Sequence, residues 1–542
     1  NIAIDESVII DDYFLNLIIE TDNIDDEGEL VYEEFSTDFS ITLNQQGFPV
    51  DMSGELISSA AIVDIDNDGE DEIISSDKGG FVHVFEMDGT EWVDDTFPYY
   101  TEDQNWGSPA IGNVNEVNSN DIIISSKNGQ IYHIESSDDP TINSIINSGG
   151  FITATPALGD IDGDGLDEII FGQYGGAQRL YAINGDGSDV VGFPIDLDEK
   201  VQRGVALADF NANNKVDIVV GTDDEFIHLI YDDGSIAWSY ETGGDIRVAP
   251  TVLELNTGEK IILVGSKDDN FYALNSDGSV RFMIETDDDI STEASVVDID
   301  GVGPVIFFAS GSMLYGVESD GEIYGDWTIN IGAEITSSIV FSKIGDATYI
   351  MFGDESGTAH MHHIQGNAYN NFPISSSFPF KGSPTILDTD GDGDLEFMMG
   401  STQTLTNIDI KEAGTVSGLW NTHRADMNRS GYYLSMIDAL DISDDIIENY
   451  EFALHNAYPN PFNPTTTIEF EVPYSMDVVL NVYDISGRLV KRLVDGIKYP
   501  GLHSVVWDGT DQYGNNVANG LYVYKLMSNQ NISISNKMIL IK

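Results

Sequence analysis

The stretch Asp160-Ile-Asp-Gly-Asp-Gly-Leu-Asp-Glu-Ile169 decides how this chain is organised. It places acidic side chains at loop positions 1, 3, 5 and 9, and it places Gly165 at position 6, where the chain must turn sharply. Hard cations such as Ca²⁺ bind about six to eight oxygen atoms, and a loop of this kind supplies several of them. Apolar runs on both sides (155–161 and 169–172) favour two short strands rather than the helices of an EF-hand. The stretch therefore predicts a metal-binding β-hairpin.

This hairpin pattern recurs from Ser59 to about Gly414. Comparable units begin at Ser59, Ser108, Thr155, Gly204, Ala249, Glu293, Ser337 and Ser383. Their spacing of about 46 residues lies within the range of roughly 40–50 residues for a four-stranded propeller blade. Each unit runs from a strand through a loop to an apolar strand and then to a third strand. We therefore predict an all-β protein containing a β-propeller of eight blades, with seven as the alternative count.

Three of the loops between the first and second strands carry a full set of acidic ligands. They are Asp64/Asp66/Asp68/Glu72, Asp160/Asp162/Asp164/Glu168 and Asp388/Asp390/Asp392/Glu396. A polar turn with local side-chain hydrogen bonds is the alternative interpretation, but four acids in register with a repeat favour a metal. We predict about three Ca²⁺ sites. A fourth loop, Asp209/Asn211/Asn213/Asp217, has fewer charges and Asn214 in place of the turn glycine, so both interpretations stay open there.

The histidines of the repeats follow a pattern that argues against catalysis. Counted from the turns, His83, His133, His228 and His360 share one position with Tyr181, Tyr272 and Tyr315. A position shared by histidine and tyrosine indicates an aromatic ring with a polar tip that packs between blades. His360 and His362 alternate on one strand, but a zinc site there would need further ligands. We find no nucleophile elbow, HExxH motif, P-loop or dinucleotide fingerprint, so we predict no catalytic residue.

The charge of the chain excludes several classes of partner. It carries 94 acidic against 22 basic residues, a net charge of −72. Binding to nucleic acid or anionic membranes needs clustered Lys and Arg, so neither is expected as a partner. No apolar run reaches the ~18 residues of a membrane span, and we expect no direct membrane insertion. The chain has no cysteine and begins at Asn1, so we expect a fragment or a processed product without disulfides.

The repeats, with their Asp-x-Asp-x-Asp-Gly loops, resemble the FG-GAP/VCBS family of β-propellers. The resemblance implies that the ring closes through a blade completed from both ends of the propeller. Gly47-Phe-Pro-Val50 matches Gly192-Phe-Pro-Ile195 inside the repeats and would complete the blade that begins at Ser383. The stretch from Trp420 to Gly431 looks like the segment that seals such repeats, and we assign it to packing.

The composition changes at Ala457. The segments Tyr458-Pro-Asn-Pro-Phe-Asn-Pro-Thr-Thr466 and Lys537-Met-Ile-Leu-Ile-Lys542 closely resemble the type A C-terminal sorting domain of the type IX secretion system. That domain is an Ig-like sandwich, also akin to the Ig module of the flagellar hook-capping protein. The resemblance implies the type IX secretion machinery as a partner through residues 457–542. It also implies a location outside the cell or on the outer surface of a Gram-negative-type bacterium.

These observations predict four segments: 1–46, the tail of a preceding β domain or a linker; 47–435, the propeller; 436–456, an acidic linker; and 457–542, the Ig-like sorting domain. The propeller is expected to bind or scaffold an unknown protein or carbohydrate ligand, and any catalytic domain would lie upstream of residue 1. The alternatives are the C-terminal part of an extracellular peptidase and a calcium-dependent polysaccharide lyase. A basic residue in the propeller's central mouth would favour the lyase, whereas the scarcity of Lys and Arg counts against it.

Overall fold

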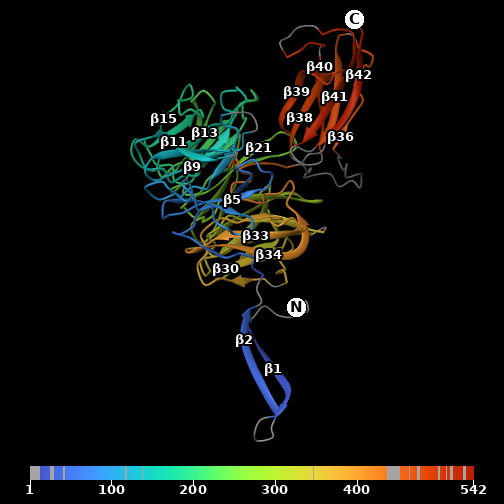
Figure 1. Ribbon diagram of the computed structural model, residues 1–542. Helices are drawn as coiled ribbons and strands as arrows, with labels where there is room; N and C mark the ends of the chain where they lie inside the picture. Colours follow the sequence, from blue (N-terminus) through green and yellow to red (C-terminus); the bar gives the residue numbers. More distant parts are fainter. Residues whose placement is uncertain are drawn as a thin grey trace. The chain divides into compact units, whose positions relative to one another are not determined.

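The computed structural model describes residues 12–24, 30–40, 43–115, 119–137, 139–345, 347–370, 372–435, 452–462, 464–472, 476–498, 501–507, 509–512, 517–528 and 533–541. Every regular element in these ranges is a β-strand, as predicted (Figure 1). No helix able to span a membrane occurs among them. The chain divides into two compact units, Asn1–Leu440 and Asp441–Lys542. Most of the predicted linker, residues 436–451, lies outside the described residues.

The first unit contains eight successive four-stranded antiparallel blades, one for each predicted repeat, and a further strand pairing joins the seventh and eighth blades into one eight-stranded sheet. The first blade contains β4 (Ala61–Val63), β5 (Glu72–Ser76), β6 (Phe81–Glu86) and β7 (Tyr99–Tyr100), and the second contains β8 (Ala110–Gly112), β9 (Asp121–Ser125), β10 (Gln130–Glu135) and β11 (Thr141–Asn147). The third contains β12 (Ala157–Gly159), β13 (Glu168–Gly172), β14 (Arg179–Ile183) and β15 (Ile195–Asp196). The fourth contains β16 (Val205–Ala208), β17 (Asp217–Gly221), β18 (Phe226–Ile230) and β19 (Ile236–Glu241). The fifth blade contains β20 (Thr251–Glu254), β21 (Lys260–Gly265), β22 (Asn270–Asn275) and β23 (Val280–Glu285), and the sixth contains β24 (Ser295–Ile299), β25 (Gly303–Ser310), β26 (Met313–Glu318) and β27 (Ile323–Asn330). The seventh contains β28 (Val340–Ile344), β29 (Ala347–Gly353), β30 (Thr358–His363) and β31 (Ile374–Ser375). The eighth contains β32 (Thr385–Leu387), β33 (Asp394–Gly400), β34 (Thr404–Thr415) and β3 (Val50–Asp51). The described blade count is therefore eight rather than seven.

The last sheet closes the ring in the predicted way. Strand β3, from the start of the propeller, pairs with β34 through Val50↔Leu405 and Asp51↔Thr404. At the inner end of the same junction, the hydroxyl oxygens of Ser59 and Thr385 lie 2.9 Å apart. The first and eighth blades are thus joined by side chains as well as by the shared strand.

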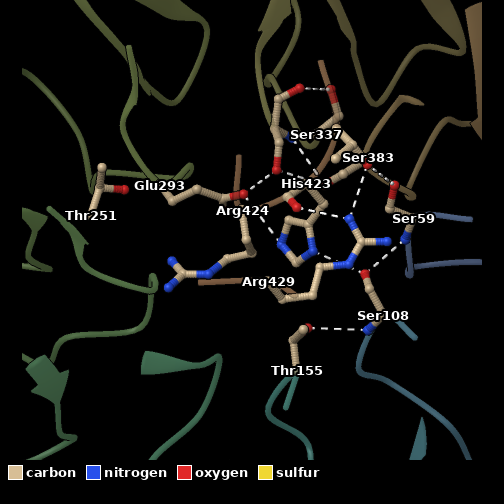
Figure 2. A network of polar contacts seen from close by, with 12 residues as sticks. Ser59, Ser108, Thr155, Thr251, Glu293, Ser337, Ser383, His423, Arg424 and Arg429 are labelled. Carbon is tan, nitrogen blue, oxygen red and sulfur yellow. Dashed lines mark hydrogen bonds and ion pairs between the residues drawn. The ribbon is translucent and has the colours of Figure 1, made fainter. Parts of the chain in front are cut away.

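A Ser or Thr near the start of several units connects one blade to the next. The Ser59 backbone N–H donates to Ser108 Oγ at 2.9 Å, and the Ser108 N–H donates to Thr155 Oγ1 at 3.1 Å (Figure 2). On the other side of the ring, the Ser338 N–H donates to Ser383 Oγ at 3.2 Å. Each hydroxyl satisfies a backbone donor that the preceding sheet leaves unpaired, and buried donors need such partners.

A single segment, residues 420–434, lines the inner strands of six blades. Its carbonyl oxygens at Trp420, Asn421, Met427, Asn428, Ser430 and Gly431 accept the backbone N–H groups of Phe341, Ile386, Ile111, Leu158, Leu207 and Val252, at 2.8–2.9 Å. Its last part forms β35 (Tyr432–Leu434), which pairs in parallel with β20. The predicted sealing segment therefore extends the hydrogen bonding of the blades toward the propeller axis.

Two buried arginines hold this segment in place. Arg429 donates to Pro109 O at 2.9 Å and to Ala60 O at 3.2 Å, which belong to different blades. Arg424 donates to Pro250 O at 2.7 Å and also to Val205 O. Burial lowers the pKa of each guanidinium to about 10, so both remain charged at neutral pH. Each charge is spread over several carbonyl oxygens, which is the condition for burying it.

The second unit is a β-sandwich of two sheets. One contains β36 (Ala453–Leu454), β37 (Thr466–Val472) and β40 (Gly501–Trp507); the other contains β39 (Leu489–Lys498), β38 (Met476–Asp484), β41 (Gly520–Ser528) and β42 (Ser533–Leu540). Trp507, Phe470, Leu480 and Tyr524 form part of the core between them. Strand β36 falls within the predicted linker, so the sandwich begins before the predicted boundary at residue 457.

The N-terminal segment contains an antiparallel hairpin of β1 (Asp12–Ile24) and β2 (Leu30–Ser40). Both strands lie within residues 1–46, and residues 1–11 lie outside the described residues. The assignment of residues 1–46 to a preceding β domain or a linker stays a prediction.

Replacing Arg429 with Ala should destabilise the propeller by about 3 kcal/mol or more, because several buried carbonyl groups would lose their donor. Thermal unfolding followed by circular dichroism measures the loss. Arg179→Ala is a matched control, since it removes only an exposed ion pair with Asp196 and should leave the melting temperature nearly unchanged. Equal melting temperatures for the two variants would contradict the role assigned to Arg429.

Candidate metal loops and central cavity

The loops between the first and second strands of blades one, three and eight each bring three carboxylates together. The groups are Asp64, Asp66 and Glu72; Asp160, Asp162 and Glu168; and Asp388, Asp390 and Glu396. Within each group, one oxygen atom of every residue lies within 4.8 Å of the others. The loop positions brought together are 1, 3 and 9. These groups can hold a metal ion.

The acids at loop position 5 lie outside these groups. Asp68 Oδ1 accepts the Glu70 N–H at 2.9 Å, and Asp164 Oδ1 accepts the Leu166 N–H at 2.9 Å. Asp392 makes the equivalent bond with Asp394, at 3.1 Å. The predicted ligands at this position therefore turn the backbone locally, in the manner of an Asx turn.

The glycine at loop position 6 has the predicted role. The N–H groups of Gly69, Gly165 and Gly393 donate to the first aspartate of their own loops at 3.0–3.1 Å. Their φ angles of 91–100° lie in the region that favours glycine. This bond folds the loop back on its first ligand, which is why a local sequence pattern is enough to form the group.

The glutamate at position 9 is the buried member of each group. Glu72 and Glu168 accept the backbone N–H of Ile65 and Ile161, at 2.9 and 2.8 Å. Burial raises the pKa of Glu72 to about 7 and that of Glu168 to about 8, and the nearby aspartates add to the increase. In the third loop, Oε1 of Glu396 is buried and has no hydrogen-bond partner among the described residues. An oxygen-only donor set with an unpaired buried carboxylate oxygen fits a hard divalent cation.

The fourth loop folds like the others but presents amide donors. Asn211 Nδ2 donates to Asp217 Oδ1 at 3.2 Å, and Asn213 Nδ2 donates to Asp232 Oδ1 at 2.9 Å. Lys215 Nζ lies 3.6 Å from the other oxygen of Asp232. Asp209 accepts the Asn214 N–H at 2.7 Å, with Asn214 at a φ of 62°. Its four predicted ligands form no acidic group among the described residues, and a lysine already supplies positive charge.

In blade two, the carboxylate that corresponds to the position 9 glutamate is Asp121. It accepts hydrogen bonds from Ser119 Oγ at 2.5 Å and from the His133 ring at 2.8 Å. Side-chain donors thus satisfy this buried acid in a loop that lacks the other acidic ligands. His133 therefore belongs to the loop and not to the shared column in which the sequence placed it.

The shared column is the third residue of each third strand. Its members in blades one to seven are His83, Tyr132, Tyr181, His228, Tyr272, Tyr315 and His360. Blade two has no Asp-Gly turn from which to count, so the count missed Tyr132 by one residue. The polar tips contact loops: His360 Nε2 lies 2.9 Å from Asp354, and the Tyr132 hydroxyl donates to Thr101 O at 2.9 Å. These contacts give the His or Tyr at this position a structural role.

A cavity of about 290 Å³ lies at the centre of the propeller, at the strand ends opposite the metal loops. Lys78, Arg203 and Lys381 line it, together with Glu55, Glu293 and Glu334. The chain's scarcity of Lys and Arg therefore does not extend to this cavity, and the basic residue that would favour the lyase is present. The sequence analysis missed this set because its members come from different blades. One signal was present: Glu293 stands at a unit start where most units have Ser or Thr.

Glu293 and His423 both line the cavity and contact each other within a polar network (Figure 2). His423 Nε2 lies 3.3 Å from Glu293 Oε1, and His423 Nδ1 lies 2.9 Å from Ser108 Oγ. Burial would raise the pKa of Glu293, but His423, the Ser338 hydroxyl and the charge of Arg424 hold it well below its ordinary value. Burial lowers the pKa of His423. The Glu293 carboxylate is therefore ionised and lies against the imidazole ring of His423.

Comparisons with known proteins find two local family matches. Residues 160–220 match an FG-GAP-like repeat, and residues 459–531 match a FlgD Ig-like domain. No curated protein matches the chain. Similar solved structures include BamB from Moraxella catarrhalis, with 14% identity over 67% of this chain and 96% of that chain and a TM-score of 0.46. The computationally designed Ika8 protein has 12% identity over 68% of this chain and 100% of that chain, with a TM-score of 0.47. The chain is thus similar to FG-GAP propeller repeats followed by an Ig-like domain.

The three acidic groups should bind three hard cations, while the fourth loop should bind none. Titration with the luminescent probe Tb³⁺ measures the number of sites. Asp162→Ala should lower the number of bound ions by one, because it removes a carboxylate from one group. Asp209→Ala, the control in the fourth loop, should not change it. A lower stoichiometry in Asp209→Ala would show that the amide-rich loop binds a cation.

Proposed function

We propose that this chain is a secreted or cell-surface, calcium-stabilised β-propeller that serves as a binding or scaffold module of a larger exported protein. Residues 457–542, within the sandwich, would be the sorting domain recognised by the type IX secretion machinery. The observation that carries the proposal is the recurrence of one acidic group at the same loop of three blades. Such repetition around a ring suits a structural ion better than a single reaction centre.

The contacts of the third blade's loop support a structural role for calcium. Asp160, whose carboxylate belongs to the group, accepts the Val216 N–H through its backbone oxygen at 3.1 Å. Asp167, in the same loop, accepts the Asn113 N–H at 2.9 Å. The loop is thus bonded to the blades on both sides. A cation that orders this loop would also hold three neighbouring blades in register.

Two observations support export. Residues 459–531 are similar to a FlgD Ig-like domain, and the sandwich is a compact unit of its own. The terminal segment Lys537-Met-Ile-Leu-Ile-Lys542 adds the sorting-domain resemblance found in the sequence. A sorting domain needs to fold independently and to present its terminal segment to the type IX secretion machinery.

A polysaccharide lyase is the second candidate, since Lys78, Arg203 and Lys381 line the central cavity. A lyase must neutralise a uronate carboxylate and remove the neighbouring carbon-bound proton. His423 is the imidazole in the cavity, but its Nδ1 contacts Ser108 and its Nε2 contacts Glu293. Neither ring nitrogen is therefore placed to remove a proton from a substrate. We therefore propose a binding module rather than an enzyme. The peptidase alternative would need a catalytic domain outside this chain.

Removing calcium should destabilise the propeller. Since the cation binds only the folded loop, a site at a hundredfold excess over its Kd contributes about 2.7 kcal/mol. Differential scanning calorimetry with chelator should show the propeller transition shifted down by many degrees and the sandwich transition unchanged. Asp162→Ala should reproduce part of the shift, and Asn115→Ala, in the loop of blade two, should not. An unchanged propeller transition in chelator would disprove the stabilising role.

Deleting the sandwich should block export without unfolding the propeller. The deletion should begin at residue 452, because β36 pairs with β37 and would otherwise be left behind. In a host with the type IX machinery, the truncated chain should stay inside the cell while the full-length chain reaches the exterior. Immunoblots of cell and medium fractions measure this, with calorimetry to check the propeller. Normal export of the truncated chain would overturn the sorting assignment.

A further inference from the structure

The central cavity has the surface chemistry of a site for polyhydroxylated ligands. Much of its lining is hydroxyl-bearing, including Ser108, Thr153, Thr292, Thr336 and Ser383. Ile57, Val248 and the Trp106 indole add apolar surface. A hydroxyl group both donates and accepts, so it can pair with ligand hydroxyls in either direction. A sugar ring, with hydroxyls at its edge and C–H groups on its faces, matches this mixture.

Arg203 is the one cation in the lining whose side chain has no hydrogen bond or ion pair to the described residues, and the Glu293 carboxylate is the charge that acts on it. Lys78 lies 2.7 Å from Glu55, and Lys381 lies 3.1 Å from Glu355. The Arg203 guanidinium is exposed and makes no hydrogen bond or ion pair to the described residues. The chain has 94 acidic residues, yet the guanidinium donors of this arginine form no hydrogen bond or ion pair inside the cavity. They are therefore available for an external anion. A guanidinium binds a carboxylate through two parallel hydrogen bonds.

The charge balance limits that anion to a single negative charge. The lining carries three cations, Lys78, Arg203 and Lys381, against three carboxylates, Glu55, Glu293 and Glu334. A phosphate dianion or a polyanion would bring more charge than Arg203 can neutralise. It would also approach against the field of a chain with a net charge of −72. One carboxylate on an otherwise neutral body fits both constraints.

We propose that the central cavity binds an acidic saccharide with one uronate unit, whose carboxylate pairs with Arg203 and whose hydroxyls pair with the Ser and Thr side chains of the wall. This rests on the proposed binding function and names its ligand class. Glu293 would accept a hydrogen bond from the inserted ring, while His423 stays bound to Ser108 and Glu293. Arg203 would then distinguish a uronate from the corresponding neutral sugar.

Isothermal titration calorimetry of the full chain with Ca²⁺ present tests the proposal. The probe is a disaccharide of glucose and glucuronate, and the neutral glucose disaccharide is the comparison ligand. The native chain should bind the uronate at least tenfold more tightly than the neutral sugar. Arg203→Gln should abolish that preference, and Arg203→Lys should keep part of it, because lysine retains the charge but not the paired donors.

Arg247→Gln is the matched control. Arg247 stands before the first strand of blade five, but Asp245 holds its guanidinium at 2.6 Å, so the substitution should leave the uronate preference unchanged. The Arg203 side chain makes no hydrogen bond or ion pair to the described residues, and unchanged melting of both Arg203 variants confirms that they are folded.

Several outcomes would overturn the proposal. They are no binding of the uronate, equal binding of the neutral sugar, and persistence of the preference in Arg203→Gln. Binding of glucose 6-phosphate as tight as that of the uronate would indicate a general anion site. Equal binding of a short peptide through its C-terminal carboxylate would indicate a peptide site. The chelation and export experiments decide the proposed function independently of these results.

Discussion

The hydrogen bonds between residues 420–434 and the inner strands are the interactions on which the propeller depends. An inner strand has one sheet neighbour and, on its other edge, backbone groups that face the axis. In six blades one of these groups donates to a carbonyl of this segment. Arg424 and Arg429 then join carbonyls of separate blades. Without the segment, these donors and carbonyls would be buried with no partner, which folded proteins avoid.

The acidic loops act at a greater distance from the axis. Their backbones bond to neighbouring blades, as Asp160 does with Val216. A cluster of carboxylates with a buried glutamate is unfavourable by itself, and the raised pKa of Glu168 reports that cost. A cation reverses the sign of the local interaction. Blade two shows the other solution, in which one acid, Asp121, remains and His133 and Ser119 satisfy it.

The two ends of the strands have different chemistry. The loops between first and second strands concentrate carboxylates, whereas the opposite ends carry paired lysines and the hydroxyl-lined cavity. The alternation of strand direction produces this separation, since successive connections emerge at opposite ends. The groups that can hold a metal ion therefore lie at the end of the strands opposite the cavity.

The sequence by itself determined the blades, the three acidic groups and the strand that closes the ring. All of these follow from short-range patterns: strand-forming runs, a turn glycine and an aspartate that accepts an N–H five residues later, as Asp160 does from Gly165. The sequence misplaced His133, because blade two lacks the Asp-Gly turn from which the column is counted in other blades. It also included Asp164 among the ligands; one oxygen of that carboxylate accepts the Leu166 N–H, and its role as a ligand stays a prediction. The tertiary structure alone decided the cavity with Arg203, Glu293 and His423, because these residues meet only when the ring closes and residues 420–434 occupy its centre.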